Sequence, residues 1–91
     1  MLVLSRTLGE SILIDGKHKV TLIRADDEIA DVSFIEDSKP GKGRLISLPR
    51  AKRVEVVPAM FLVFVEYLAD RTETRVRLGI DAAPDVHVKK I

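Results

Sequence analysis

The sequence predicts an all-β fold of small antiparallel sheets. Short runs of apolar or alternating residues recur along its 91 positions, and Gly, Pro or Asp residues typical of turns separate them. The runs are rich in Val, Ile and other residues that pack well in strands. A chain of this length has room for one compact domain, and domains this small often gain core by pairing with a second subunit.

The first part of the chain is expected to form four strands, at residues 2–5, 11–14, 19–24 and 29–35. Gly9 lies in the connection between the first two. Asp15-Gly16 is typical of a hairpin turn, because Gly tolerates the positive φ angles that such turns require. Asp26 and Asp27 then turn the chain into the fourth strand. The prediction is therefore two successive hairpins.

Residues 36–53 change character, with prolines, glycines and basic side chains around a short apolar stretch. We expect an exposed connection that contains one short strand near residues 45–48. Its basic residues are Lys39, Lys42, Arg44, Arg50, Lys52 and Arg53. A charge run of this kind is usually a solvated loop, and the alternative is a surface that extends a nucleic-acid site.

Residues 60–68 are apolar at almost every position, and two structures fit them. Pro58 could occupy the first position of a helix, whereas the β-branched and aromatic content favours a buried strand. We expect the strand and keep a short helix in this part of the chain as the alternative. Strands at residues 75–80 and 86–89 follow, on either side of a turn at residues 81–84.

Two tracts, residues 19–35 and 62–80, are loosely alike. Each has an apolar strand, an acidic turn and a second strand. A duplicated hairpin would give this pattern. Any two unrelated hairpins would give it too, and that interpretation is favoured.

Composition limits the function classes. A formal charge of +1 excludes nucleic-acid binding through diffuse charge, so any RNA affinity has to come from a local patch. The sequence has no Cys, which excludes disulfides and a Cys nucleophile and fits a reducing cytoplasm. No apolar run is long enough to span a membrane. His18 and His87 lack partners at metal-site spacings and are expected at the surface. We see no catalytic apparatus, and expect neither an enzyme nor a cofactor.

The two ends of the chain carry the most specific pattern. Residues 1–14 read MLVLSRTLGESILI, and residues 76–90 read VRLGIDAAPDVHVKK. In this order, the two segments closely resemble the first and last strands of the carbon storage regulator family (CsrA/RsmA-like).

The resemblance implies a post-transcriptional regulator that acts in the cytoplasm as a homodimer. Subunits of that family exchange strands, so that the first strand of one chain lies beside the last strand of the other. Two identical composite sites follow from the symmetry. Each binds a GGA-containing loop in the 5′ leader of an mRNA, near the ribosome-binding site, and alters translation or transcript stability. A small regulatory RNA or a protein can act as antagonist.

Carried over to this sequence, the resemblance assigns RNA-binding residues at both ends of the chain. Positive charge comes from the basic members of the set, and backbone groups at strand edges read the bases. For the apolar members the alternative is core packing. The residues are Leu4, Arg6, Val86, Val88, Lys89 and Lys90.

The chain departs from the family pattern in three ways. Thr7 stands where many members carry a second basic residue. Lys90 stands where the family has arginine, which loses the planar fork suited to base contacts. The third departure is a long insertion within about residues 19–59. Either residues 19–24 form the family's third strand and the insertion follows them, or residues 60–68 form it and the insertion precedes them. We favour the second placement.

A competing hypothesis keeps the scaffold and changes its use. The chain would be a protein-interaction module with weak or no RNA binding, in which the insertion docks a partner or covers the RNA site. Salt-dependent binding of RNA would argue against it.

Overall fold

The computed structural model describes residues 1–36 and 41–91 and is all-β, with no helix among those residues. Residues 11–14 and 29–35 form strands with the expected bounds, and residues 60–68 form a strand, so the helix alternative is wrong there. The strands are β1 (Leu2–Thr7), β2 (Ser11–Ile14), β3 (His18–Ala25), β4 (Ile29–Ile35), β5 (Gly43–Pro49), β6 (Arg53–Val57), β7 (Met60–Ala69), β8 (Thr74–Asp81) and β9 (Val88–Lys90).

Several strands differ from the expected bounds. Strand β1 runs on to Thr7, and β5 covers Gly43–Pro49, pairs with β4 and buries Leu48, so this part of the chain is not an exposed connection. Strand β6, which ends just before Pro58, is not among the expected strands. Strand β9 is shorter than residues 86–89 predicted, since it begins at Val88. The Asp15-Gly16 turn is confirmed, with φ angles of 58° and 66°.

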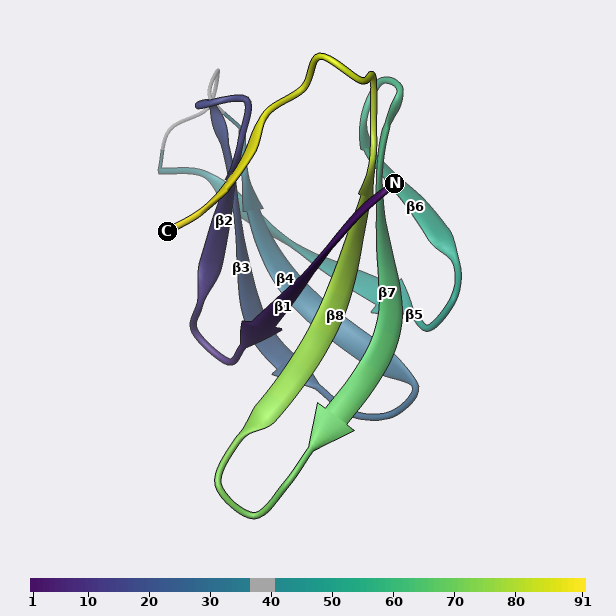
Figure 1. The fold of residues 1–91 in the computed structure, drawn as a ribbon. Helices are drawn as coiled ribbons and strands as arrows, with labels where there is room; N and C mark the ends of the chain where they lie inside the picture. The colour runs from purple at the N-terminus through teal and green to yellow at the C-terminus, as the bar shows by residue number, and fades with distance from the viewer. Residues whose placement is uncertain (37–40) are drawn as a thin grey trace.

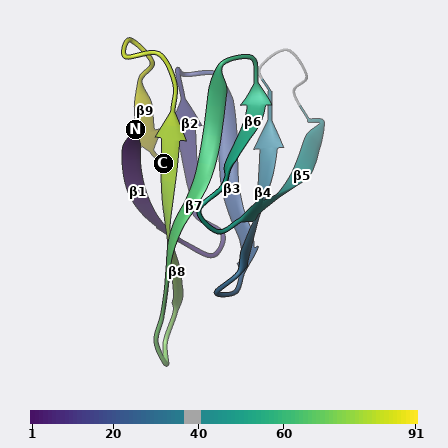
Figure 2. The same cartoon turned by 90° about the vertical axis from the view of Figure 1, so that its right-hand side faces the viewer.

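The strands form two antiparallel sheets. One has the order β1-β8-β7-β6, and the other has the order β5-β4-β3-β2-β9 (Figure 1). The sheets face each other in two layers, with β1 and β9 together at one side of the molecule and β5 at the other (Figure 2). The core between them is fully buried and includes Leu22, Phe34, Phe64 and Leu78. Residues 19–59, where we expected an insertion, supply most of β3 and all of β4 to β6 and so belong to both sheets.

The strands divide into an N-terminal repeat (β1–β4) and a C-terminal repeat (β5–β8). The two repeats have equivalent strands: β1 corresponds to β5, β2 to β6, β3 to β7 and β4 to β8. When each strand is replaced by its equivalent, the sheet order β1-β8-β7-β6 becomes β5-β4-β3-β2, which is the order in the other sheet. Each repeat therefore gives its first strand to the sheet that the other repeat builds. Strand β9 is outside this symmetry, because among the described strands none pairs with the outer edge of β6.

The two repeats also share local geometry, in their register shifts and in the corners after their first strands. The register shifts just after Leu22 in β3 and just after Phe64 in β7. At the corner after β1, the Gly9 N–H donates to the Leu22 carbonyl at 2.7 Å, and after β5 the Ala51 N–H donates to the Phe64 carbonyl at 2.8 Å. Gly9 and Ala51 both have positive φ, 84° and 66°. The expected hairpins in residues 19–35 and 62–80 are thus equivalent parts of two structural repeats.

The resemblance implies that the first strand lies beside the last strand of another subunit, whereas within this single chain β1 and β9 belong to different sheets and do not pair with each other. Strand β1 pairs with β8 from Leu2↔Ile80 to Thr7↔Arg75. Strand β9 pairs with β2, with Lys90 opposite Ile12. The homodimer itself stays a prediction, since one chain is described.

A buried carboxylate joins β3, β4 and β5. Asp31 is 7% exposed, and its side chain accepts hydrogen bonds from Ser47 Oγ at 2.7 Å and from Arg24 at 2.6 and 2.9 Å. The hydrogen bond from Ser47, and then those from Arg24, hold the pKa of Asp31 below its ordinary value. The ionised form is therefore the one that the folded chain stabilises.

We expect Asp31→Asn to make the chain less stable at neutral pH and less sensitive to acid. A folded pKa below the unfolded one adds stability above the unfolded pKa, and that stability is lost as pH falls below about 4 through the folded pKa. Urea denaturation between pH 7 and pH 2.5 measures both effects. An acid dependence equal to that of the unmodified chain would contradict this role for Asp31.

Ala51→Gly should stabilise the chain. L-residues are strained at positive φ, and the equivalent corner already has Gly9, so we expect a gain of about 0.5–1 kcal/mol in the free energy of unfolding. Ala25→Gly is the matched control, since Ala25 lies in β3 without positive φ and should lose about 0.5–1 kcal/mol. A loss in both variants, measured by urea denaturation, would show that Ala51 is unstrained.

Candidate nucleic-acid interface

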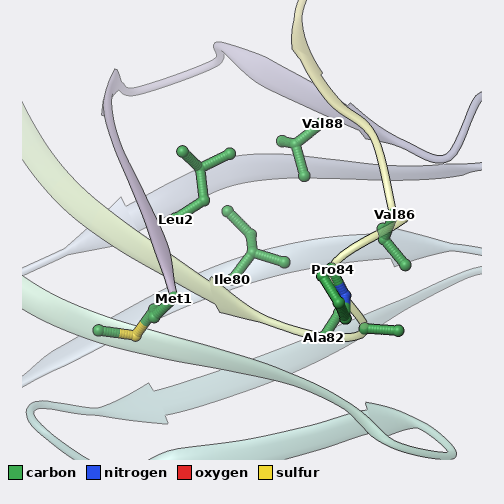
Figure 3. A pocket seen from close by; sticks show the side chains of 8 residues that line it. Met1, Leu2, Ile80, Ala82, Pro84, Val86 and Val88 are labelled. Carbon is green, nitrogen blue, oxygen red and sulfur yellow. The ribbon is translucent and has the colours of Figure 1, made fainter.

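Strands β1 and β9 border a small apolar hollow, which we call the β1–β9 groove. It is about 160 Å³ in volume and is lined by Met1, Leu2, Ile80, Ala82, Ala83, Pro84, Val86 and Val88. Leu2, Ile80 and Val88 come from three different strands, and their side chains point toward one another (Figure 3). The groove therefore exists because β1 and β9, from the two ends of the chain, lie at neighbouring edges of the two sheets.

Alternation along the strands decides which side chains face the groove. Leu4 lies opposite Leu78 and Arg6 opposite Val76, and both partners are fully buried core residues. Since alternate residues of a strand share a face, the side chains at positions 2, 4 and 6 of β1 all face the space between the sheets. In β9, Val88 is opposite the buried Ile14 and so faces the same space.

Arg6 meets the C-terminal strand at one carbonyl group. Its guanidinium donates to Ser11 O at 3.3 Å, and the Ile91 N–H donates to the same oxygen at 3.3 Å. The side chain of Arg6 is only 11% exposed, and its Nε also donates to Ser5 O at 2.6 Å. Arg6 thus lies next to the end of β9 within one chain, and much of its hydrogen-bonding capacity is used internally.

The carboxylate of Glu10 partly offsets the positive charge of Arg6. Its carboxylate accepts a hydrogen bond from the Thr7 N–H at 2.8 Å and lies 3.9 Å from Arg6 Nε. The hydrogen bonds from Thr7, followed by the charge on Arg6, hold the pKa of Glu10 below its ordinary value. The carboxylate therefore stays ionised beside the guanidinium. The exposed lysines next to the groove are Lys89 and Lys90 of β9, of which Lys90 shares the strand face of Val88 and Lys89 lies on the other face.

The apolar residues of the predicted site are half-buried. Leu4, Val86 and Val88 all pack against the core, and Val86 and Val88 also line the groove. Val86 and Val88 therefore pack against the core and line the groove at the same time. Sequence reasoning missed Leu2, Ile80 and Pro84; Leu2 and Ile80 could have been found from the alternation of β1 and β8, whereas Pro84 is placed by a turn.

The basic tract does not extend the groove. Arg44 lies in β5 and Arg53 in β6, at the edges of the sheets opposite to β9 and β1. Arg53 pairs with Asp81 at 3.1 Å and lies 4.0 Å above the ring of Phe61. Lys39 lies outside the described residues.

His18 differs from the expectation for a surface residue. It is partly buried at the start of β3, and its ring stacks on Phe34 at 5.6 Å. Its buried Nδ1 has no hydrogen-bond partner among the described residues. Within residues 1–36 and 41–91, no three His, Cys, Asp or Glu side chains gather in a way that could hold a metal ion. The same residues form no helix that could cross a membrane.

Comparison with known proteins returned no relative. No protein-family model matches the chain, and no curated protein or solved structure matches it.

Arg6→Ala should destabilise the chain, because the partly buried Arg6 side chain links β1 to the Ser11 carbonyl of β2. Loss of hydrogen bonds from a charged group predicts a fall of about 1–3 kcal/mol in the free energy of unfolding. Arg75→Ala is the control, since Arg75 is exposed in β8 and bonded to Glu73; a change within about 0.5 kcal/mol is expected there. Equal effects in urea denaturation would contradict a structural role for Arg6.

Proposed function

We propose that this chain is a sequence-selective RNA-binding regulator that takes up an unpaired, GGA-containing segment of an mRNA 5′ leader at the β1–β9 groove. The observation that carries the proposal is the meeting of the two chain ends. The segments that resemble the carbon storage regulator family, residues 1–14 and 76–90, supply all the residues that line the groove. Residues that are far apart in sequence thus form one compact site.

The chemistry of the site suits single-stranded RNA. Strands β1 and β9 each end a sheet, so each has an outer edge whose backbone donors and acceptors are available to base edges. Unpaired bases can present their edges and faces to such a surface, whereas bases within an A-form helix cannot. The apolar lining offers contact area for a base, and Lys89 and Lys90 offer charge for phosphates.

Two halves of one chain can serve here as two subunits serve in the family. Arg6 and the end of β9 meet at Ser11 O without a second chain. The residues between the family-like ends then act as the parts of a second repeat, and not as an inserted loop. A homodimer is not needed to complete the β1–β9 groove.

The two lysines of β9 supply the decisive test. A hairpin RNA with GGA in its loop is titrated at two salt concentrations, beside a hairpin with those bases changed. The double variant Lys89→Ala, Lys90→Ala should bind about tenfold more weakly at low salt, and the slope of log K against log salt should shrink by about 1.4, since each lost phosphate contact accounts for about 0.7 on a single strand. Lys89 and Lys90 are exposed, so stability should change little.

Lys52→Ala is the matched control, because Lys52 is an exposed lysine at the corner between β5 and β6, away from the groove. Its affinity should equal that of the unmodified chain. If the unmodified chain fails to distinguish the two hairpins, the proposal is wrong. The competing function, a protein-interaction module, would then be favoured, and the internal use of Arg6 and the carboxylate of Glu10 fit that function.

A further inference from the structure

The symmetry of the repeats generates a second position equivalent to the β1–β9 groove. A second hollow, also of about 160 Å³, lies there and is lined by Phe34, Glu36, Lys42 and Arg44. The register of the sheets makes the two hollows correspond. Leu2 pairs with Ile80 in one sheet, and Arg44 pairs with Phe34 in the equivalent place of the other.

The second hollow lacks the strand that completes the first. Strand β9 pairs with β2, where Val88 is opposite Ile14. The residue equivalent to Ile14 is Val56 of β6, and among the described strands none pairs with that edge. The guanidinium of Arg44 takes the place of such a strand, because it donates a hydrogen bond to the Val56 carbonyl oxygen.

Arg44 also lines the second hollow, with its side chain 54% exposed. It lies 5.3 Å from the centre of the Phe34 ring and 3.7 Å from the carboxylate of Glu36. The equivalent positions in the β1–β9 groove are Leu2, Ile80 and Ala82, so an apolar lining has become an ion pair over an aromatic ring. Both features disfavour RNA binding. The Val56 carbonyl at the strand edge is already hydrogen-bonded and so is not available to a base, and the Glu36 carboxylate repels phosphates.

Strand β5 also lacks, at the equivalent position, the positive charge that Arg6 gives to β1. In β1, Arg6 lies opposite Val76, whereas the equivalent residue of β5 is Leu48, which lies opposite Ala30 and is fully buried. The second position thus has neither the last strand nor the arginine of the first.

From these differences we infer that each chain binds one RNA segment, at the β1–β9 groove, and that Arg44 closes the symmetry-related position. The inference rests on the proposed function and adds the number of RNA segments that one chain binds. A monovalent binder cannot bridge two loops of one transcript. It gains nothing from a second loop beyond a statistical factor of about two, whereas a bivalent binder gains about 10²–10⁴ from effective concentration.

The test compares two RNAs, one with a single GGA loop and one with two such loops joined by a flexible spacer. With excess single-loop RNA, native mass spectrometry should show one chain with one RNA. The two-loop RNA should bind two chains, each with the single-loop affinity to within about twofold. One chain with two RNAs, a dimer with two RNAs, or binding of the two-loop RNA tighter by tenfold or more would overturn the inference.

Variants at the two positions separate the outcomes. Arg44→Ala and Lys42→Ala, at two exposed residues of the second hollow, should leave single-loop affinity unchanged, whereas Lys90→Ala should weaken it severalfold. Weaker binding in both Arg44→Ala and Lys42→Ala would show that RNA contacts the second position and would overturn the inference. Absence of any binding to the single-loop RNA would refute the proposed function, and the inference with it, so the two failures are distinguishable.

Discussion

The exchange of first strands between the two repeats is the constraint on which the rest of the structure depends. Strand β1 completes the sheet of the C-terminal repeat, and β5 completes the sheet of the N-terminal repeat. Neither repeat can bury its apolar face without the other, because the core lies between the sheets and draws on Phe34 from one repeat and Phe64 from the other. The same exchange brings the N-terminus to the edge where β9 ends the second sheet, and this juxtaposition makes the β1–β9 groove.

The two repeats show how similar backbones can carry different sites. The bulges after Leu22 and Phe64 and the corner hydrogen bonds of Gly9 and Ala51 are shared. The side chains that face the two hollows are not shared. One hollow has a strand on its border, whereas Arg44 lines the other and donates a hydrogen bond to the neighbouring strand. Backbone hydrogen bonds and core packing preserve a symmetric framework, whereas surface positions are free to diverge. Function is therefore a property of the site and not of the repeat.

Much of the fold could be predicted from the sequence, because turn residues and apolar alternation are local signals. Asp15-Gly16 and the strands at residues 11–14 and 29–35 are examples. The hairpins at residues 19–35 and 62–80 look alike in the sequence, but any two hairpins share that pattern, so a repeat is not the favoured interpretation. Equivalent residues such as Arg44 and Leu2 differ in chemistry. These two residues occupy equivalent positions because of the strand register, which cannot be read from the sequence alone. The partial burial of Arg6 also escaped prediction, because it depends on Ser11 O, a backbone acceptor from the next strand.

The most direct test of this account is a map of backbone amide signals, recorded by NMR with and without the GGA hairpin RNA. The account predicts that signals of β1, of residues 84–90 and of the start of β2 shift or broaden, whereas those of β5 and β6 around Arg44 and Val56 stay in place. Shifts at both hollows would contradict the single site. Shifts confined to other surfaces, such as the turn between β7 and β8, would contradict the β1–β9 groove as the place where RNA binds.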